Sequence, residues 1–493
     1  MLGGLTLSGL QTGILAADGD RPITAPKSRT PLIVKPVLAH DLPQRKDASS
    51  WRQWGGIETK EQAEEEVGRI RTELVALQAQ ADYPIEFLEV STVTDIHQMK
   101  EHPDIAKCDV VLLYAAGLAG IGGRGVPDFG KDVILFLRWK SGPVYMQYET
   151  ASVFAVRWDS DVASDPRITN ADIVVDKPEE LDWRFRALCG LKNTKGTKIV
   201  TIGGANSLAP EPDRAITHNA VKNIWNIEYH NVSYDELSEL IDEARADAKM
   251  MERAKQRAEA YLKIPGTILE TTMEFFVNNF VIDDIFRLLM KKVDTHMITV
   301  SNCMRAIMPR ARTSACMTLC TLNDDGYKAF CESDFVVIPS GILLGNISGK
   351  PVFLNDPTYP HDNIVTVAHC TGPRKMDGKN YDPVRIVTHF ESDFGAAPHV
   401  EVPLGTITTN IIPDFKSVRW VGFKGTIVDV PFRPICRTQF DLEYEFPAEL
   451  LAERTVGFHW MTCFGDYRKE IGYALRRVGI QWDNLDNVPY GAR

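Results

Sequence analysis

The hydrophobic pattern of the chain changes once, near Gly349, and this change constrains the fold more than any other feature of the sequence. Before it, short apolar runs alternate with amphipathic helical segments; after it, long helical periods disappear and short β-type runs follow one another. Alternating strands and helices are typical of doubly wound α/β domains, whereas successive short strands indicate a mainly β domain. At 493 residues the chain is also too long for one hydrophobic core, so we expect several domains.

The first α/β domain is expected over residues 21–192. Its segment 58–80 has apolar residues at helical spacing, and the runs 108–114 and 132–139 are rich in apolar, β-branched residues. Such short apolar runs are typical of buried parallel strands. A polar, glycine-containing cluster at 192–197 predicts the end of this domain.

A second α/β domain is expected over residues 193–350. Residues 198–202 predict its first strand, which runs into a pair of glycines. Ser233 and Glu236 have the spacing of a capping box, so a helix should begin there, and its pattern continues to Leu262. Both α/β domains are therefore expected to be doubly wound and Rossmann-like.

The remaining residues, 351–493, predict a mainly β, barrel-like C-terminal domain that ends in a helix at about 466–478. Its predicted strands are 364–369, 384–390, 405–412 and 418–430.

The N-terminal residues 1–20 are apolar and small, with Ala-Ala before Asp18, and are too short to span a membrane. They are either a disordered or docked tail or the back half of an export signal that has lost its twin arginine. We expect a cytoplasmic protein, with export to the periplasm as the alternative. No other segment is apolar and long enough for a membrane helix, so no membrane partner is expected.

Bulk composition excludes some classes of function. The formal net charge is −11, which argues against a nucleic-acid-binding protein. The nine cysteines are odd in number and lack paired short spacings, so reduced, buried thiols are expected. Residues 120–125 satisfy G-x-G-x-x-G, but no helix clearly opens there and no acid follows at the required distance. We expect a flexible loop near a domain cleft rather than a dinucleotide site.

The residues best suited to chemistry lie late in the chain. Glu332 precedes an apolar segment, Asp356 and His369 each end a strand-like run, and His459 precedes the last helix. Two carboxylates and two imidazoles are a suitable donor set for a divalent cation such as Mn²⁺. Three further histidines lie nearby and could be mistaken for ligands: His361, His389 and His399.

Four motifs carry a resemblance to a known family. They are L-N-D-D-G followed by C-E-S-D at 322–334, S-G-K-P with a strand and Asp356, A-H-C-T at 368–371, and His459 before G-D-Y-R at 465–468. Together they make the chain similar, over about residues 300–493, to the L-fucose isomerase/L-arabinose isomerase superfamily.

This resemblance implies a metal-dependent aldose–ketose isomerase that acts on a pentose, hexose or deoxyhexose through an ene-diol. Glu332 and Asp356 would bind the cation (Mn²⁺ or another divalent ion) and share the catalytic acid and base roles. His369 and His459 would complete the coordination or hold sugar hydroxyls. A homo-oligomer, trimeric or hexameric, is expected.

Two other functions remain open at this point: a non-catalytic sugar-binding protein, and a related metal-dependent sugar epimerase or lyase. Arg374 and Lys375 either contact the sugar or belong to a solvated loop.

Overall fold

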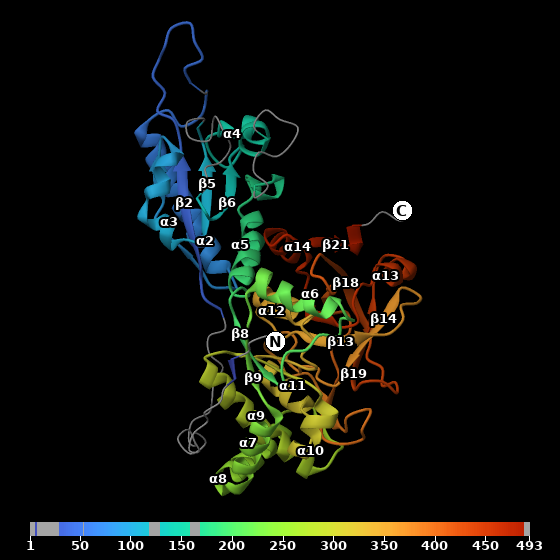
Figure 1. Ribbon diagram of the computed structural model, residues 1–493. Helices are drawn as coiled ribbons and strands as arrows, with labels where there is room; N and C mark the ends of the chain where they lie inside the picture. Colours follow the sequence, from blue (N-terminus) through green and yellow to red (C-terminus); the bar gives the residue numbers. More distant parts are fainter. Residues whose placement is uncertain (1–4, 7–28, 53, 118–128, 158–167, 488–493) are drawn as a thin grey trace. The chain divides into compact units, whose positions relative to one another are not determined.

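The computed structural model describes residues 5–6, 29–52, 54–117, 129–157 and 168–487 (Figure 1). The chain forms two compact units, Arg29–Cys189 and Gly190–Arg493, and the short N-terminal strand belongs to the second. The predicted mixed α/β class, with parallel sheets and a closed barrel, is confirmed. The three predicted domain ranges stay predictions. The second α/β region and the barrel lie together in one of the two units.

The first unit contains a parallel sheet with strand order β3-β2-β5-β6-β7, and β4 also pairs with β2. In chain order the five main strands read 2-1-3-4-5, the order of flavodoxin-like sheets. The run expected at 108–114 is the fully buried strand β5. The strands are β2 Leu32–Ala39, β3 Ile85–Phe87, β4 Ser91–Val93, β5 Val110–Ala115, β6 Asp132–Leu137 and β7 Ile173–Val175.

The main helix of this unit is α2, Lys60–Gln80, within the expected segment. It begins where the Thr59 side chain accepts from the Gln62 backbone N–H and the Gln62 side chain reciprocates, which satisfies helix-end donors. Shorter helices are α3 Pro103–Lys107 and α4 Gln147–Thr150, and α5 Glu179–Lys192 leads into the second unit.

The second unit begins with another parallel sheet, β1-β9-β8-β11-β12. Its strands are β1 Leu5–Thr6, β8 Lys198–Ile202, β9 Glu228–Val232, β11 Met297–Val300 and β12 Lys328–Phe330. The chain passes from β8 outward to β9 and then back across β8 to β11, so the winding reverses between β8 and β11. Ligands of doubly wound sheets bind at the carboxyl ends of the strands beside such a reversal.

The helix expected to continue to Leu262 is interrupted, so that prediction is wrong. The chain forms α7, Tyr234–Ala246, and α8, Ala248–Leu262. The side chain of Asp247 accepts from the backbone N–H groups of Lys249 and Met250 and begins a new helix, as aspartate does at an N-cap. At the start of α7, Ser233 caps the Glu236 N–H as expected.

The other helices of this part include α6 Asp213–Ala220, α9 Met273–Val293, α10 Met308–Ala311, α11 Cys316–Asp324 and α12 Ile338–Ser348.

Residues beyond Gly349 form a barrel. Six antiparallel strands close in the order β17-β20-β13-β14-β19-β18, because β18 also pairs with β17, and β21 joins β18 from outside the ring. The strands are β13 Phe353–Pro357, β14 Ile364–His369, β17 Ile407–Ile412, β18 Arg419–Asp429, β19 Thr438–Glu443, β20 Trp460–Phe464 and β21 Gln481–Asn484. Helix α13 is Ala448–Arg454, and α14, Arg468–Arg477, is the helix expected at 466–478.

One predicted strand lies outside the barrel. The run expected at 384–390 forms β15, Val384–Val387, in a separate sheet with β10, Thr267–Leu269, and β16, Ala397–Val400.

Two expectations fall mostly outside the described residues. Of the tail 1–20, only Leu5–Thr6 is described, as an edge strand beside β9; the glycine loop 120–125 lies wholly outside. Among the helices that the structure describes, none has the length and apolar character needed to cross a membrane.

Candidate metal centre

A cavity of about 890 Å³ lies in the second unit where the carboxyl ends of the parallel strands meet the end of the barrel. We call it the site cavity; its volume is in the range of small-molecule sites, roughly 300–1,000 Å³. Residues just after β8, β11 and β12 line one side, at the point where the winding reverses. The lining residues that the argument uses are Asn206, Cys303, Cys331, Glu332, Asp356, Thr358, His369, Cys370, His389, Cys436 and Phe458.

The barrel register brings Asp356 and His369 to this cavity and places His459 beside Asp356. Strands β13 and β20 pair at Asn355 and Trp460, so Asp356 and His459 lie one step beyond this pair, at the same end of the barrel. Strand β14 pairs with β13 at Asp356 and Ala368, and His369 follows Ala368 directly. Strands β13, β14 and β20 therefore bring these polar side chains close together.

Glu332 comes to the same place from the parallel sheet. It follows β12, and both Glu332 and Ser333 have left-handed backbone conformations, with φ of +66° and +50°. Two consecutive non-glycine residues in this region are strained by about 1–3 kcal/mol each, and such strain is concentrated at functional sites. The Glu332 side chain is 42% exposed because it faces the open cavity.

His459 lies between the two carboxylates. Its Nε2 is 3.3 Å from Oε2 of Glu332 and 3.2 Å from Oδ1 of Asp356. Neither contact has hydrogen-bond geometry, so among the described residues Nε2 of His459 and Oδ1 of Asp356 are buried polar atoms without a hydrogen-bond partner. Nε2 of His459 thus faces two carboxylate oxygens at ion-pair distance, and a divalent cation bound among these three donors would replace the proton on that nitrogen. The donor set therefore fits the expected metal.

The other nitrogen of His459 is held by a residue to which the sequence assigned no role. Nδ1 is 2.8 Å from Oδ2 of the buried Asp334, whose Oδ1 accepts from the backbone N–H groups of Leu208 and Val336. Carboxylates that hold the outer nitrogen of a ligating histidine are typical of metal sites. The signal was present, since Asp334 is the last residue of the C-E-S-D motif.

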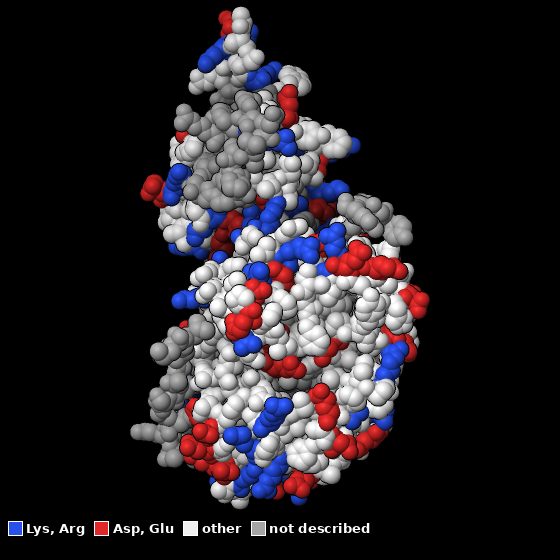
Figure 2. Space-filling view, turned by 45° about the vertical axis from the view of Figure 1, so that its right-hand side comes forward, with Lys and Arg blue, Asp and Glu red and all other residues white. Residues whose placement is uncertain are grey.

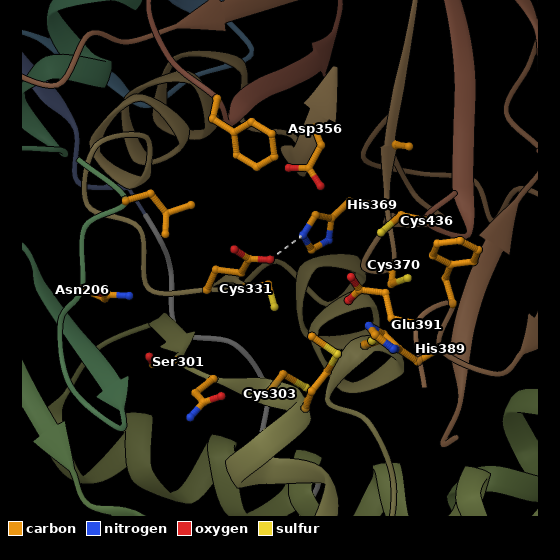
Figure 3. Close-up of a pocket in the computed structure, with 18 of the residues that line it drawn as sticks. Asn206, Ser301, Cys303, Cys331, Asp356, His369, Cys370, His389, Glu391 and Cys436 are labelled. Carbon is orange, nitrogen blue, oxygen red and sulfur yellow. Dashed lines mark ion pairs between the residues drawn. The ribbon is translucent and has the colours of Figure 1, made fainter. Parts of the chain in front are cut away.

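His369 approaches Glu332 from the opposite side to His459. Its Nε2 is 3.7 Å from Oε1 of Glu332, and its Nδ1 lies 2.9 Å from Oγ1 of Thr371. The donor atoms of His369, Glu332 and Cys331 all lie within 4.8 Å of one another, and no other set of such donors among the described residues, that of Glu332, Asp356 and His459 included, is as compact. Figure 3 shows Cys331, His369 and Asp356 around the cavity. Its dashed line marks the ion pair between His369 and Glu332, which carries no label in the picture.

The electrostatics of the cluster follow from these contacts. Burial raises the pKa of Glu332, but the imidazoles of His369 and His459 outweigh it and hold this pKa well below its usual range. Burial lowers the pKa of His459, but Asp334, Asp356 and Glu332 together raise that pKa to about 11. Burial also opposes the charged form of His369, whose pKa is nevertheless raised by Glu332 and Asp356. Glu332 is therefore ionised at neutral pH.

The structure thus brings together all four predicted residues, Glu332, Asp356, His369 and His459, and adds Cys331 and Asp334. That these residues bind metal or catalyse a reaction stays a prediction.

Of the three nearby histidines, His389 lines the cavity. His361 is exposed and pairs with Asp362, and the ring of His399 bonds the Arg437 carbonyl. The expectation of a solvated Arg374 is wrong, because its side chain is fully buried and donates to the Asp382 carbonyl. Arg374 is not among the residues that line the site cavity.

The surface carries no obvious large basic region on the face that Figure 2 draws: lysine and arginine are interspersed with aspartate and glutamate among the described residues there. This distribution accords with the net charge of −11.

No protein-family model matches the chain, and no curated protein matches it. Among solved structures, one described as a two-component system response regulator/GGDEF domain protein is similar over 60% of this chain and 90% of its own, with 11% sequence identity and a TM-score of 0.17. A TM-score this low carries no argument about fold or function.

Proposed function

We propose that the protein is a metal-dependent aldose–ketose isomerase that acts on a pentose, hexose or deoxyhexose through an ene-diol. One observation carries the proposal: Glu332 and Asp356 line a sugar-sized cavity, and the buried His459 has its Nε2 3.3 Å and 3.2 Å from their carboxylate oxygens. The donor set is rich in oxygen, which suits Mn²⁺ or a similar divalent ion.

Isomerisation of this kind moves a proton between two adjacent sugar carbons, and negative charge develops on oxygen as the proton leaves. A bound divalent cation supplies Lewis-acid stabilisation of that charge, worth several kcal/mol. Glu332, Asp356 and His459 would hold the ion, with His369 beside them.

The residues of this chain would move the proton. Glu332 is ionised and faces the cavity, so it can accept a proton from a sugar carbon. Asp356, whose side chain is 28% exposed, also faces the cavity; once it carries a proton from solvent it can give that proton to the adjacent carbon, while Glu332 passes the proton that it accepted to solvent. Which of the two acts first depends on how the sugar binds.

Other lining residues suit a sugar. Asn206 and Thr358 offer hydrogen-bonding groups for hydroxyls. The ring of Phe458 is 56% exposed and lines the same cavity, so it offers an apolar face to the C–H side of a sugar ring. A few placed polar groups in a partly apolar cavity are typical of small-molecule sites.

In this proposal the two parallel sheets are the cores of doubly wound, Rossmann-like domains, and the barrel is the C-terminal domain. The resemblance over residues 300–493 further supports a homo-oligomer, trimeric or hexameric, that acts in the cytoplasm.

The test is incubation of the protein with Mn²⁺ and a panel of aldopentoses, aldohexoses and deoxyhexoses, followed by identification of the products. The proposal expects a ketose from at least one aldose, and no ketose after chelation. Recovery of an epimer or a cleavage product would instead show an epimerase or lyase. Binding without any change in the sugar would show a sugar-binding protein.

A further inference from the structure

The two oxygens of the Glu332 carboxylate face two different histidines. Oε2 lies 3.3 Å from Nε2 of His459, whereas Oε1 lies 3.7 Å from Nε2 of His369. Each histidine has one more donor beside it: Asp356 on the His459 side and Cys331 on the His369 side. One carboxylate is thus shared by two donor sets.

The backbone explains how Cys331 reaches the cavity. Strand β12 ends at Phe330, so the alternation of side chains along an extended strand does not apply to Cys331 and Glu332. The left-handed conformations of Glu332 and Ser333 turn the chain sharply after the strand, and both Cys331 and Glu332 line the site cavity. The strained turn therefore adds a sulfur donor to the oxygen and nitrogen donors.

We propose that Cys331, Glu332 and His369 form a second cation position, with Glu332 bridging to an ion held by Asp356 and His459. This inference rests on the proposed function for the first ion and adds the second; with both ions bound, both oxygens of Glu332 are engaged and Asp356 is the carboxylate left to move the proton. A sulfur, nitrogen and oxygen set suits a borderline ion such as Zn²⁺ or Co²⁺, whereas the Asp356 side suits Mn²⁺.

Binding at the second position needs no oxidant. The Cys331 thiol gives its proton to solvent as its sulfur bonds to the cation.

Other thiols in the same cavity provide matched controls. The thiol of Cys316 interacts electrostatically with those of Cys303 and Cys370, and the thiol of Cys370 with that of Cys436. These four sulfurs thus interact with one another, and none of them belongs to the compact group with Glu332 and His369. Cys436 lines the cavity and is partly exposed, so it is the best control.

The experiment is titration of the metal-free, reduced protein with Co²⁺, followed by near-ultraviolet absorption and by the ratio of bound Co²⁺ to chain. The wild type should bind two ions and show a sulfur-to-cobalt charge-transfer band. Cys331→Ser should bind one ion and lack the band, and Cys436→Ser should behave as the wild type. Circular dichroism checks folding, and Cys331→Ala serves if the serine variant does not fold.

Three outcomes contradict the inference. Wild-type protein that binds one Co²⁺ without the band has a single position, and the proposed function survives. A band that persists in Cys331→Ser comes from another thiol, and the second position is then misplaced. Absence of any Co²⁺ or Mn²⁺ binding overturns both the inference and the proposed function.

Discussion

At the scale of single residues, the two ring nitrogens of His459 have separate environments. Nδ1 is fixed by Asp334, and Nε2 is directed between Glu332 and Asp356. A histidine that is held in this way presents one nitrogen to a cation without having to reorient. Asp334 is therefore a positioning residue, since it acts on the site through His459.

Asp334→Asn should weaken Mn²⁺ binding by about 10–100-fold, the usual effect of losing such a partner. Asparagine keeps the size of the side chain and one acceptor oxygen, but it loses the negative charge that faces Nδ1 of His459. Calorimetric titration with Mn²⁺ measures the change, with Asp362→Asn, at an exposed position beside His361, as the control. Unchanged affinity in folded Asp334→Asn would show that His459 needs no such support.

Glu332→Gln should reduce turnover by at least about 10²–10⁴-fold, the typical contribution of general acid–base catalysis. Glutamine preserves the size of the side chain but cannot accept a proton or attract a cation by charge. The measurement is the rate of ketose formation together with bound Mn²⁺ and circular dichroism. Glu401→Gln, at an exposed glutamate outside the cavity lining, should keep the wild-type rate.

How much of the site the sequence predicted can be explained at this scale. Carboxylates and imidazoles near strand ends pointed to Glu332, Asp356, His369 and His459 only together with the motifs of the family resemblance, because each of these residues alone often has a purely structural role. Cys331 was not predicted as a donor, since the nine cysteines lack paired short spacings and were expected to be reduced, buried thiols. The left-handed turn at Glu332 and Ser333 follows Cys331 directly, and nothing in those residue types signals that turn.

At the scale of elements, the end of helix α11 is tied to the loop after β14. Asp324, the last residue of the helix, accepts from the backbone N–H groups of Arg374 and Lys375 through Oδ1. Burial raises the pKa of Asp324 from 3.8 to about 7, although these N–H groups oppose the shift. The contact therefore links the stability of this junction to pH.

The sign of this link follows from the two pKa values. Because the folded pKa of Asp324 lies above the unfolded one, its contribution to stability is fully present below the unfolded pKa and is lost as pH rises through about 7. The free energy of unfolding of the wild type, relative to Asp324→Asn, should therefore fall between about pH 4 and about pH 8. Urea denaturation of both proteins checks it, and parallel pH profiles would contradict the assignment.

Elements also show where sequence patterns reach their limit. The buried strands β5 and β8 and the final helix α14 were predicted from local pattern, because burial imposes the pattern directly. The break at Asp247 was missed, since one N-cap residue inside a continuous helical pattern gives a weak signal. The register that places Asp356 beside His459 depends on pairing between β13 and β20, which no local pattern contains.

At the scale of the whole molecule, the candidate metal centre lies entirely within the unit Gly190–Arg493. A cation that binds only the folded state should stabilise this unit, by about 2.7 kcal/mol at a free concentration one hundred times its dissociation constant. Thermal unfolding with Mn²⁺ and with EDTA measures the effect. We expect Mn²⁺ to raise the transition of this unit and to leave the transition of Arg29–Cys189 unchanged. An equal shift of both transitions, or no shift of either transition, would contradict the placement of the ion.

The most direct test of the central claim is the conversion of sugars by wild-type protein and Glu332→Gln, both loaded with Mn²⁺ and followed by nuclear magnetic resonance. The proposed function predicts that the wild type converts at least one aldose into its ketose and that chelation stops this conversion. It also predicts that the Mn²⁺-loaded Glu332→Gln variant does not carry out the conversion. If every aldose is recovered unchanged from the Mn²⁺-loaded wild type, the proposed function is wrong. If Glu332→Gln converts the aldose at the wild-type rate, the proposed site is wrong.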